Sequence, residues 1–479
     1  MSKSNNMMKN SFLYMLSMVI PKIVALLMLP IFSYYIIPEE QGIYTYTQNV
    51  VTVFNIFSVL GLNVYYLRYY TAKEKEVNFS GTFFWFIILW NVVLLGIGTP
   101  VFWFAWNKVG IEFLFFPYMF MALVHNFMLA LEIIPMRAYR MKGEVNVYFR
   151  KIMIKTVIST GIAIWLVFFC KMGIMGRYWA DIISSAVLGV LFIIYMLQNS
   201  QFGIEVKELK EGLKFSLPIL PANIIQVSEP LVKSVIIERM FPLAELGIYS
   251  MGASLANMIS VLSQSFSMAV EPEIYARADK PEYMEYMNKI KKMYMVLGIV
   301  GGLFFGIFIR EAVYICLSDS YYESWEVVQP LVISYVLAML TGLLSSMIII
   351  QNKGKLLAWV NLSYLVVTII GSVLVLKISS VSMLGWVNVA GQLMMIVVLY
   401  SLLRKGLTKT FKLRWDLMYI TIMCVVLVLT NSLNQLPFFV CVCVKLLVWL
   451  AGSYITLICY GYSIKDVKQL IIGFIKRKG

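Results

Sequence analysis

Several ionisable side chains lie inside long apolar segments of this chain, where a charged group is energetically unfavourable. A charge at the centre of a membrane helix costs about 2.5–3.5 kcal/mol on scales derived from membrane insertion. The candidates are the basic residues Lys22, Arg68, Lys155, Lys233 and Lys445, the acidic residues Glu132, Asp181, Glu229 and Glu271, and the only histidine, His125. A polar substrate or a coupling ion would be expected to bind at such positions.

Glu229 and Lys233 stand four residues apart, so on a helix they share one face, with the glutamate in the favourable N-terminal position. One interpretation is a pair lining a cavity, which a substrate or an ion separates during transport. The other is a pair that neutralises itself and so makes membrane insertion less costly. The sequence leaves both open.

Lys22 and Arg68 are the other candidate cations. Lys22 follows Pro21, where a helix is expected to bend, and we favour an ammonium that faces a water-filled cavity over one that reaches the membrane surface. Arg68 stands where a helix meets the cytoplasm and is either a cation at the cavity mouth or an ordinary surface charge. With Lys233, these residues are the predicted site for an anionic substrate.

Three carboxylates are candidates for coupling transport to a proton or a sodium ion, namely Glu229, Asp181 and Glu132. Asp181 could equally lie near the outer surface. For Lys155 we expect a side chain that reaches the membrane surface, and for His125 a packed or interfacial role. Lys445 should face a polar partner or the outer surface.

The chain offers little for catalysis or metal binding. Its six cysteines are scattered through apolar segments, and Cys441 and Cys443 have no histidine or acidic neighbours in sequence. No nucleotide-binding loop of the form GxxxxGK[ST] occurs. We therefore expect no metal, no cofactor and no enzymatic activity.

A short element occurs twice. Residues 38–44 read PEEQGIY and residues 242–249 read PLAELGIY. Two prolines precede each copy, Pro21 and Pro30 before the first, Pro221 and Pro230 before the second, and we expect them to bend their helices. Each copy suits a helix start: proline in the first turn, acidic residues near the positive end of the dipole, and a glycine that admits a close neighbour. We expect the element to mark helix starts rather than to do chemistry.

Composition identifies the class of protein. Hydrophobic residues make up 60% of the 479 residues and charged residues 14%, which predicts an all-α integral membrane protein. Apolar segments long enough to cross a bilayer predict about fourteen transmembrane helices. Their approximate ranges are 11–37, 42–67, 80–106, 113–136, 152–170, 176–197, 214–238, 246–270, 293–316, 327–351, 355–376, 381–403, 415–433 and 437–460.

The net charge of +15 indicates topology, not nucleic-acid binding. Most basic residues fall in alternate connections, around residues 73–75, 137–151, 207–210, 277–292, 353–355 and 404–414, and at both chain ends. The positive-inside rule assigns these to the cytoplasm, together with both termini. The first apolar segment is too long for a signal peptide and contains Lys22, so it should remain as the first helix.

The repeated element divides the chain. Its glycines, Gly42 and Gly247, stand 205 positions apart, and six predicted helices separate the two copies. An even number gives both halves one orientation, which predicts a parallel pseudo-repeat of two six-helix lobes. We place the N-terminal lobe at 1–205, the C-terminal lobe at 206–406, and an appended helix pair with a basic cytoplasmic tail at 407–479.

The opening residues Leu29, Pro30, Ile31 and Phe32, followed by PEEQGIY, resemble the start of Wzx-type polysaccharide flippases of the MATE-like superfamily. The resemblance implies a transporter of the bacterial cytoplasmic membrane. It would move undecaprenyl-pyrophosphate-linked oligosaccharides to the outer leaflet by alternating access, for surface polysaccharide biosynthesis. It also implies membrane lipids, a polysaccharide polymerase and glycosyltransferases as partners, with a proton or sodium gradient or substrate supply as the energy source.

Two related functions stay open. A multidrug or cation antiporter of the same superfamily should favour carboxylates within the membrane, whereas this chain has similar numbers of both signs. A flippase for the peptidoglycan precursor lipid II is the other. A membrane glycosyltransferase or ligase would need a catalytic acidic site or a large external loop, and the sequence has neither.

Overall fold

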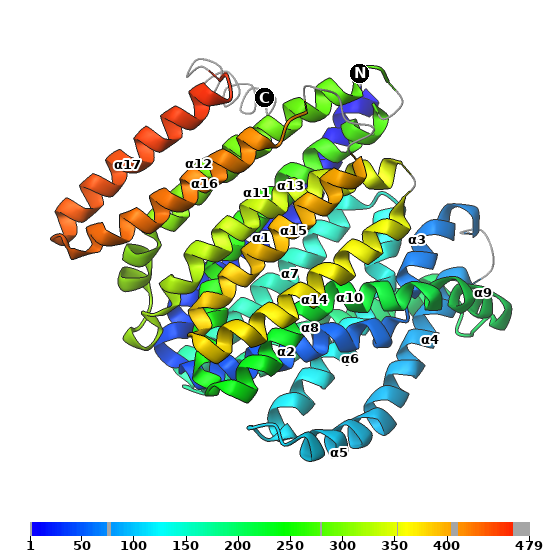
Figure 1. The fold of residues 1–479 in the computed structure, drawn as a ribbon. Helices are drawn as coiled ribbons and strands as arrows, with labels where there is room; N and C mark the ends of the chain where they lie inside the picture. Colours follow the sequence, from blue (N-terminus) through cyan, green and yellow to red (C-terminus); the bar gives the residue numbers. More distant parts are fainter. Residues whose placement is uncertain (1, 74–77, 278–279, 352, 404–410, 463–479) are drawn as a thin grey trace. The chain divides into compact units, whose positions relative to one another are not determined.

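The computed structural model describes residues 2–73, 78–277, 280–351, 353–403 and 411–462 of the chain (Figure 1). In these ranges the chain is helical apart from short connections. It forms two compact units, residues 1–251 and 252–479. The predicted basic tail falls in residues 463–479 and lies outside the described ranges.

Unit 1 begins with a long helix and ends within the first turns of α11. Its helices are α1 (Ser2–Tyr35), α2 (Pro38–Val59), α3 (Leu62–Lys73), α4 (Phe79–Val93), α5 (Thr99–Val109), α6 (Phe120–Met141), α7 (Val145–Ala163), α8 (Gly173–Asn199), α9 (Val206–Ser216), α10 (Leu220–Met240) and the start of α11 (Leu243–Ala276). Short π-helices adjoin α4, α6 and α7 at Leu94–Gly98, Phe115–Met119 and Ile164–Phe169.

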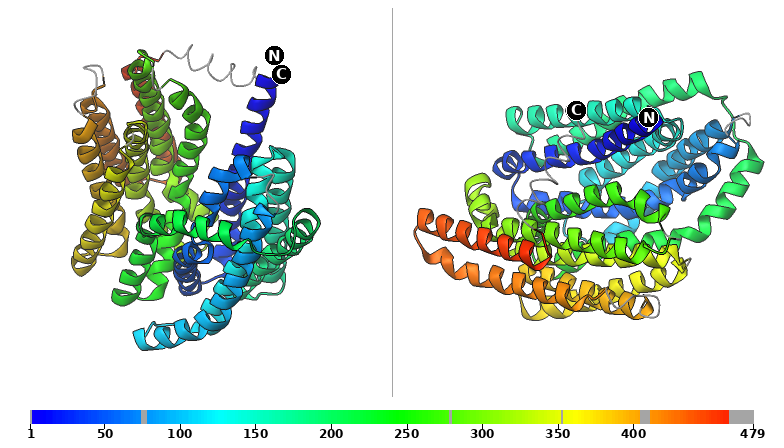
Figure 2. Two further views of the ribbon diagram at one scale, coloured as in Figure 1. Left: turned by 90° about the vertical axis from the view of Figure 1, so that its right-hand side faces the viewer. Right: turned by 90° about the horizontal axis from the view of Figure 1, so that it is seen from above.

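Unit 2 holds the rest of α11 and six further helices. They are α12 (Tyr283–Cys316), α13 (Ser324–Ile350), α14 (Gly354–Ile378), α15 (Leu384–Leu403), α16 (Arg414–Thr430) and α17 (Phe438–Cys459). Helices α16 and α17 lie side by side and pack on α12 (Figure 2). They are the predicted appended pair.

The described residues contain twelve helices long and apolar enough to cross a membrane. A thirteenth span results if α2 and α3, which meet at an angle of 43°, are counted as one broken span. The remaining predicted range corresponds to α10, which carries Pro221, Pro230, Glu229 and Lys233 and is not among these spans. Twelve to thirteen spans in the described residues agree approximately with the predicted count of about fourteen.

Two predicted helices are not straight. The segment predicted at 42–67 breaks at Leu60 and Gly61, which both have positive φ angles and so end α2. The segment predicted at 80–106 is α4 and α5 joined by a π-helix, which interrupts the regular hydrogen bonds. The sequence pattern did not show either break, because apolar residues continue through both.

Packing within each unit follows the same scheme. In unit 1, α6 packs on α4 and α8, and α7 packs on α8. In unit 2, α13 packs on α12 and α15, and α14 packs on α15. In the predicted order of spans, α4, α6, α7 and α8 are helices three to six, and α12, α13, α14 and α15 are helices nine to twelve. Each contact in unit 1 therefore has its counterpart six helices later in unit 2, which agrees with a parallel pseudo-repeat.

Candidate functional site

Helix α10 carries a buried ammonium beside a more accessible carboxylate. Lys233 Nζ lies 2.5 Å from Glu229 Oε1, and the two side chains are 6% and 24% exposed. The i, i+4 spacing predicted from the sequence therefore forms a real ion pair. The glutamate is the more exposed partner of the pair, and the lysine is buried.

Helix α2 holds this part of α10 in place (Figure 1). Asn49 of α2 donates from Nδ2 to Ser234 Oγ at 2.8 Å, next to Lys233 in the chain. Ser234 Oγ in turn donates to the carbonyl oxygen of Pro230, which lies inside α10. Polar contacts from both helices thus fix the backbone that carries the ion pair.

The two tyrosines of the repeated element each lie beside charged residues. Tyr249 interacts electrostatically with Lys233 and Glu229. Tyr44 donates a 2.7 Å hydrogen bond to Asp181 Oδ2 of α8, and the Arg177 guanidinium lies 3.8 Å from the centre of the Tyr44 ring. The first copy of the element therefore also places a phenol against charged groups.

The two copies also pack against each other. A methyl group placed on Gly42 would overlap the carbonyl oxygen of Leu243, and one placed on Gly247 would overlap that of Pro38. When the GIY triplets are aligned, Pro38 corresponds to Leu243, so the contact is reciprocal. The close approach predicted for Gly42 is confirmed, and its partner is the second copy.

Further contacts join this crossing to α8. Arg177 donates from Nη1 to Gln41 Oε1 at 2.9 Å, and Gln41 Nε2 donates to Ser250 Oγ at 3.3 Å. Gln41 and Ser250 are both buried. The α2–α11 crossing and the Tyr44–Asp181 contact therefore belong to one polar network.

A second ion pair of unit 1 joins α6 and α7. Lys155 Nζ lies 2.7 Å from Glu132 Oε1, and both side chains are partly exposed. Lys155 therefore contacts a carboxylate rather than only extending toward the membrane surface. His125, also on α6, is partly buried, in keeping with the packed role expected for it.

The other predicted cations have their own surroundings. Lys22 is partly exposed on α1. Arg68 is exposed on α3, and its guanidinium lies 5.1 Å from the centre of the Phe215 ring of α9. Arg68 thus stacks on an aromatic residue, a contact that the sequence did not indicate.

The four prolines occupy two kinds of position. Pro21 and Pro30 lie inside α1, and Pro230 lies inside α10. Pro221 lies in the first turn of α10, where a missing N–H leaves no hydrogen bond unmade. A role for Pro21, Pro30 and Pro230 in bending these helices remains a prediction.

Unit 2 contains two buried ion pairs between helices. Lys291 Nζ of α12 lies 2.6 Å from Asp416 Oδ2 of α16, and Tyr460 Oη donates to Asp416 Oδ1 at 2.8 Å. Further along α12, Glu311 Oε1 accepts from Lys445 Nζ of α17 at 2.6 Å. Lys445 therefore faces the polar partner expected for it.

Four charged residues with these contacts were not among the candidates predicted from the sequence: Arg177, Lys291, Asp416 and Glu311. Arg177 stands four residues before Asp181, the same spacing that drew attention to Glu229 and Lys233. Lys291 falls in the predicted connection 277–292, and Asp416 lies in the first turn of α16, both places where charges are ordinary. Glu311 lies near the end of an apolar run, and only the partner on α17 shows its role.

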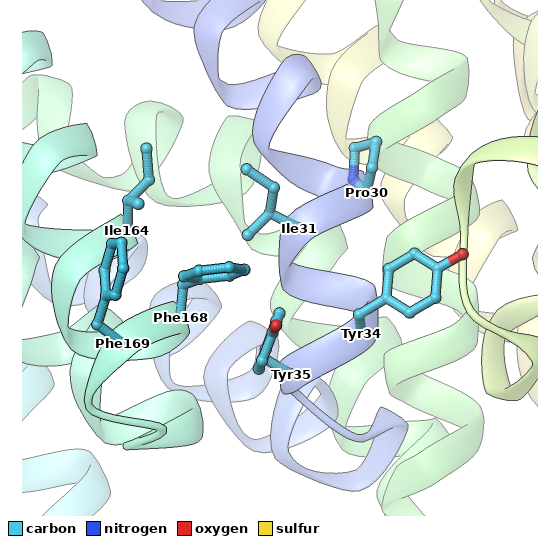
Figure 3. A pocket seen from close by; sticks show the side chains of 7 residues that line it. All are labelled: Pro30, Ile31, Tyr34, Tyr35, Ile164, Phe168 and Phe169. Atoms are coloured by element: carbon cyan, nitrogen blue, oxygen red, sulfur yellow. The ribbon is translucent and has the colours of Figure 1, made fainter.

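An apolar pocket of about 670 Å³ lies between the end of α1 and the π-helix that follows α7 (Figure 3). Its lining consists of Pro30, Ile31, Tyr34 and Tyr35 from α1, with Ile164, Phe168 and Phe169 opposite. Such a lining accepts a hydrocarbon chain and offers little to a charged group. Among the described residues, no group of three His, Cys, Asp or Glu side chains could hold a metal ion.

These features define a multi-pass membrane protein of transporter architecture. The chain belongs to a family of polysaccharide biosynthesis proteins, whose model matches residues 31–326. That range includes both copies of the repeated element and the α10 ion pair. The family and the fold are those of membrane transporters rather than of catalytic enzymes.

Solved structures of the MOP superfamily share the fold. The lipid II flippase MurJ in an inward closed conformation matches with a TM-score of 0.71 and 13% identity, over 93% of this chain and 99% of MurJ. An inward-facing multidrug resistance MATE transporter matches with a TM-score of 0.57 and 13% identity, over 86% and 94% of the two chains. A MOP superfamily transporter from Pyrococcus furiosus, described as having a binding pocket of reversed polarity, matches with a TM-score of 0.53 and 14% identity, over 87% and 96%.

At these identities the comparisons establish the fold, and the resemblance to MATE-like transporters noted in the sequence is confirmed. No curated protein sequence matches the chain in a direct search.

Proposed function

We propose that this chain moves undecaprenyl-pyrophosphate-linked oligosaccharides across the bacterial cytoplasmic membrane by alternating access, for surface polysaccharide biosynthesis. Membership of the polysaccharide biosynthesis family is the observation that carries the proposal. The positive-inside rule places both termini in the cytoplasm. A polymerase and glycosyltransferases would then be the neighbouring partners.

Lys233 is the residue we assign to the anionic part of the substrate. A pyrophosphate carries several negative charges and needs cations within the membrane. Lys233 supplies a buried ammonium whose carboxylate partner is the more exposed of the two. We assign Lys22 and Arg68 to the same substrate along its path, and the apolar pocket at Pro30 to a hydrocarbon chain.

Coupling to an ion gradient would use the carboxylates. When a pyrophosphate displaces Glu229 from Lys233, the released carboxylate would be the binding site for the coupling ion. Substrate and ion would then bind at neighbouring positions of one helix. Asp181 and Glu132 are the other coupling candidates, held by Tyr44 and by Lys155 respectively.

Replacement of Lys233 tests the proposal. Lys233→Ala and Lys22→Ala should each lower surface polysaccharide, by about tenfold for Lys233 if one charge-assisted contact is lost. Lys377→Ala is the control, because Lys377 is exposed at the end of α14. The measurement is surface polysaccharide per folded transporter in whole cells. A wild-type amount of surface polysaccharide in both variants would contradict the proposed cationic site.

Glu229→Gln tests the coupling role. The variant keeps the shape of the side chain and removes its charge, so transport should lose dependence on the ion gradient. An unchanged gradient dependence would remove Glu229 from the mechanism.

A lipid II flippase is the second candidate, because the MurJ structure matches the chain over almost its whole length. Both substrates carry an isoprenoid pyrophosphate, so Lys233 would serve either. The two functions separate in proteoliposomes: the proposal expects transport of a lipid-linked polysaccharide repeat unit in preference to lipid II. A multidrug antiporter fits less well, since Glu132 and Glu229 are each paired with a lysine.

A further inference from the structure

A polar pocket of about 350 Å³ lies in unit 2, at the end of α12 farthest from the basic residues Lys289, Lys291 and Lys292. Its walls come from the C-terminal part of α12, the connection to α13, and the short helix Asn431–Gln435 that joins α16 to α17. These two connections lie at the same end of the unit (Figure 1). With the topology proposed above, the pocket opens to the outside.

Aromatic rings form one part of the lining. Tyr314 and Tyr322 stack with their ring centres 4.3 Å apart and their planes 25° from parallel. Trp325 also lines the pocket and is partly exposed. Tyr314 is 44% exposed, although it lies near the end of a membrane helix. The pocket therefore has the partly exposed Trp325 ring beside a stacked pair of tyrosines.

Polar groups held in fixed positions form the rest. Asn431 and Gln329 exchange two amide hydrogen bonds of 2.9 and 3.0 Å, and Gln329 is buried. Asn434 Oδ1 accepts from the buried Lys445 at 2.8 Å. Arg310 donates to the backbone carbonyl oxygen of Asn434 at 3.1 Å and lies over the Tyr314 ring.

The buried ion pair of Glu311 and Lys445 thus holds Asn434, one of the residues that line the pocket. Lys445 donates both to Glu311 and to Asn434, so the helix that carries Asn431 and Asn434 is tied to α12. The side chains that line the pocket need little rearrangement before they bind a ligand, which lowers the entropy cost of binding.

We propose that this pocket binds one or two sugar rings of the transported oligosaccharide on the outer side of the membrane. Sugar rings present an apolar C–H face to aromatic surfaces and hydroxyl groups to planar amides, carboxylates and guanidinium groups. Trp325 supplies the aromatic surface, next to the stacked Tyr314 and Tyr322, and Asn431, Glu326 and Arg310 supply the polar groups. The volume is at the lower end of the range for ligand pockets, which are roughly 300–1,000 Å³. The inference rests on the proposed function for the identity of the sugar-bearing substrate.

Binding of a free glycan tests the pocket separately from transport. The probe is the oligosaccharide released by mild acid from the lipid-linked intermediates of the source cell. Its contact with the full-length protein in detergent is measured by saturation-transfer NMR and by titration. We expect Trp325→Ala and Tyr314→Ala each to weaken binding roughly fivefold to tenfold, the effect of losing one aromatic contact.

Matched variants keep the result interpretable. Trp359→Ala removes an exposed tryptophan of α14 outside the pocket and should leave binding unchanged. Trp325→Phe keeps an aromatic face and should restore most of the affinity. A single elution peak and an unchanged unfolding temperature identify the variants that fold.

Equal binding of the glycan by the wild type, Trp325→Ala and Tyr314→Ala would contradict the proposal that this pocket binds sugar. So would a wild type that transports the lipid-linked repeat unit but does not bind the free glycan, and in that case the proposed function stands. If the wild type binds the glycan through Trp325 but does not transport the lipid-linked form, the sugar site stands and the proposed function fails.

Discussion

The Glu229–Lys233 pair of unit 1 and the Glu311–Lys445 pair of unit 2 differ in what they connect. In unit 1, Glu229 and Lys233 lie on one helix, and the glutamate is accessible. In unit 2, Glu311 and Lys445 lie on different helices and are 10% and 2% exposed. The first pair lies within α10, whereas the second joins α17 to α12. We infer that the first pair is available to a substrate and that the second is structural.

The two buried ion pairs described in unit 2 lie toward opposite ends of α12. Lys291 and Glu311 are 20 residues apart in one helix, which corresponds to about 30 Å, the thickness of a bilayer core. Each pairs with a different helix of the appended hairpin, Lys291 with α16 and Glu311 with α17. Ion pairs about 30 Å apart along α12 therefore join the hairpin to this helix, and we expect the hairpin to move with it.

Loss of one buried partner in unit 2 should have the largest effect on stability. Lys445→Ala leaves the Glu311 carboxylate buried without its ammonium, and removing one partner of a buried pair costs about 3–5 kcal/mol. Denaturant unfolding of the detergent-solubilised protein measures this loss. The double variant Glu311→Leu with Lys445→Met should recover much of it, and a single variant as stable as the wild type would contradict the structural role.

The glycine crossing should show the next largest effect. Gly42→Ala or Gly247→Ala introduces a methyl group where a backbone carbonyl already lies, and overpacking costs about 1–3 kcal/mol. Gly161→Ala in α7 is the control, because the methyl group there meets open space and a helical alanine is favoured by roughly 0.5–1 kcal/mol. Thermal unfolding of all three variants measures the difference. Equal stability of Gly42→Ala and Gly161→Ala would show that the crossing is not tight.

An exposed pair should contribute least. Glu273 of α11 and Arg277, just after that helix, lie 3.8 Å apart, and their side chains are 61% and 39% exposed. Exposed pairs contribute about 0–1 kcal/mol, so Glu273→Gln should leave the unfolding midpoint almost unchanged and transport intact. A loss comparable to that of Lys445→Ala would mean that exposure does not separate the two kinds of pair.

The membrane fold followed from the sequence because apolar length and charge distribution suffice for it. Each of the fourteen predicted ranges has a helical counterpart, including those that became α14 and α16. The breaks at Leu60 and Gly61 and at the π-helix after α4 did not follow, since they depend on packing rather than on hydropathy.

The candidate site was only partly predictable. The Glu229–Lys233 pair could be read from its spacing, because both members belong to one helix. Partners on different helices could not be paired, as Tyr44 with Asp181 or Glu311 with Lys445 show. The reciprocal contact between Gly42 and Gly247 was hidden for the same reason, although the repeat itself was visible.

Exchange of charges within each pair tests the central distinction most directly. The variants are Glu229→Lys with Lys233→Glu in unit 1, and Glu311→Lys with Lys445→Glu in unit 2. Transport of a lipid-linked oligosaccharide into the opposite leaflet of proteoliposomes is measured for each folded variant. We predict that the unit 2 exchange retains most transport, since the helices stay connected, and that the unit 1 exchange loses it. Wild-type transport by the unit 1 exchange would contradict a substrate role for Lys233.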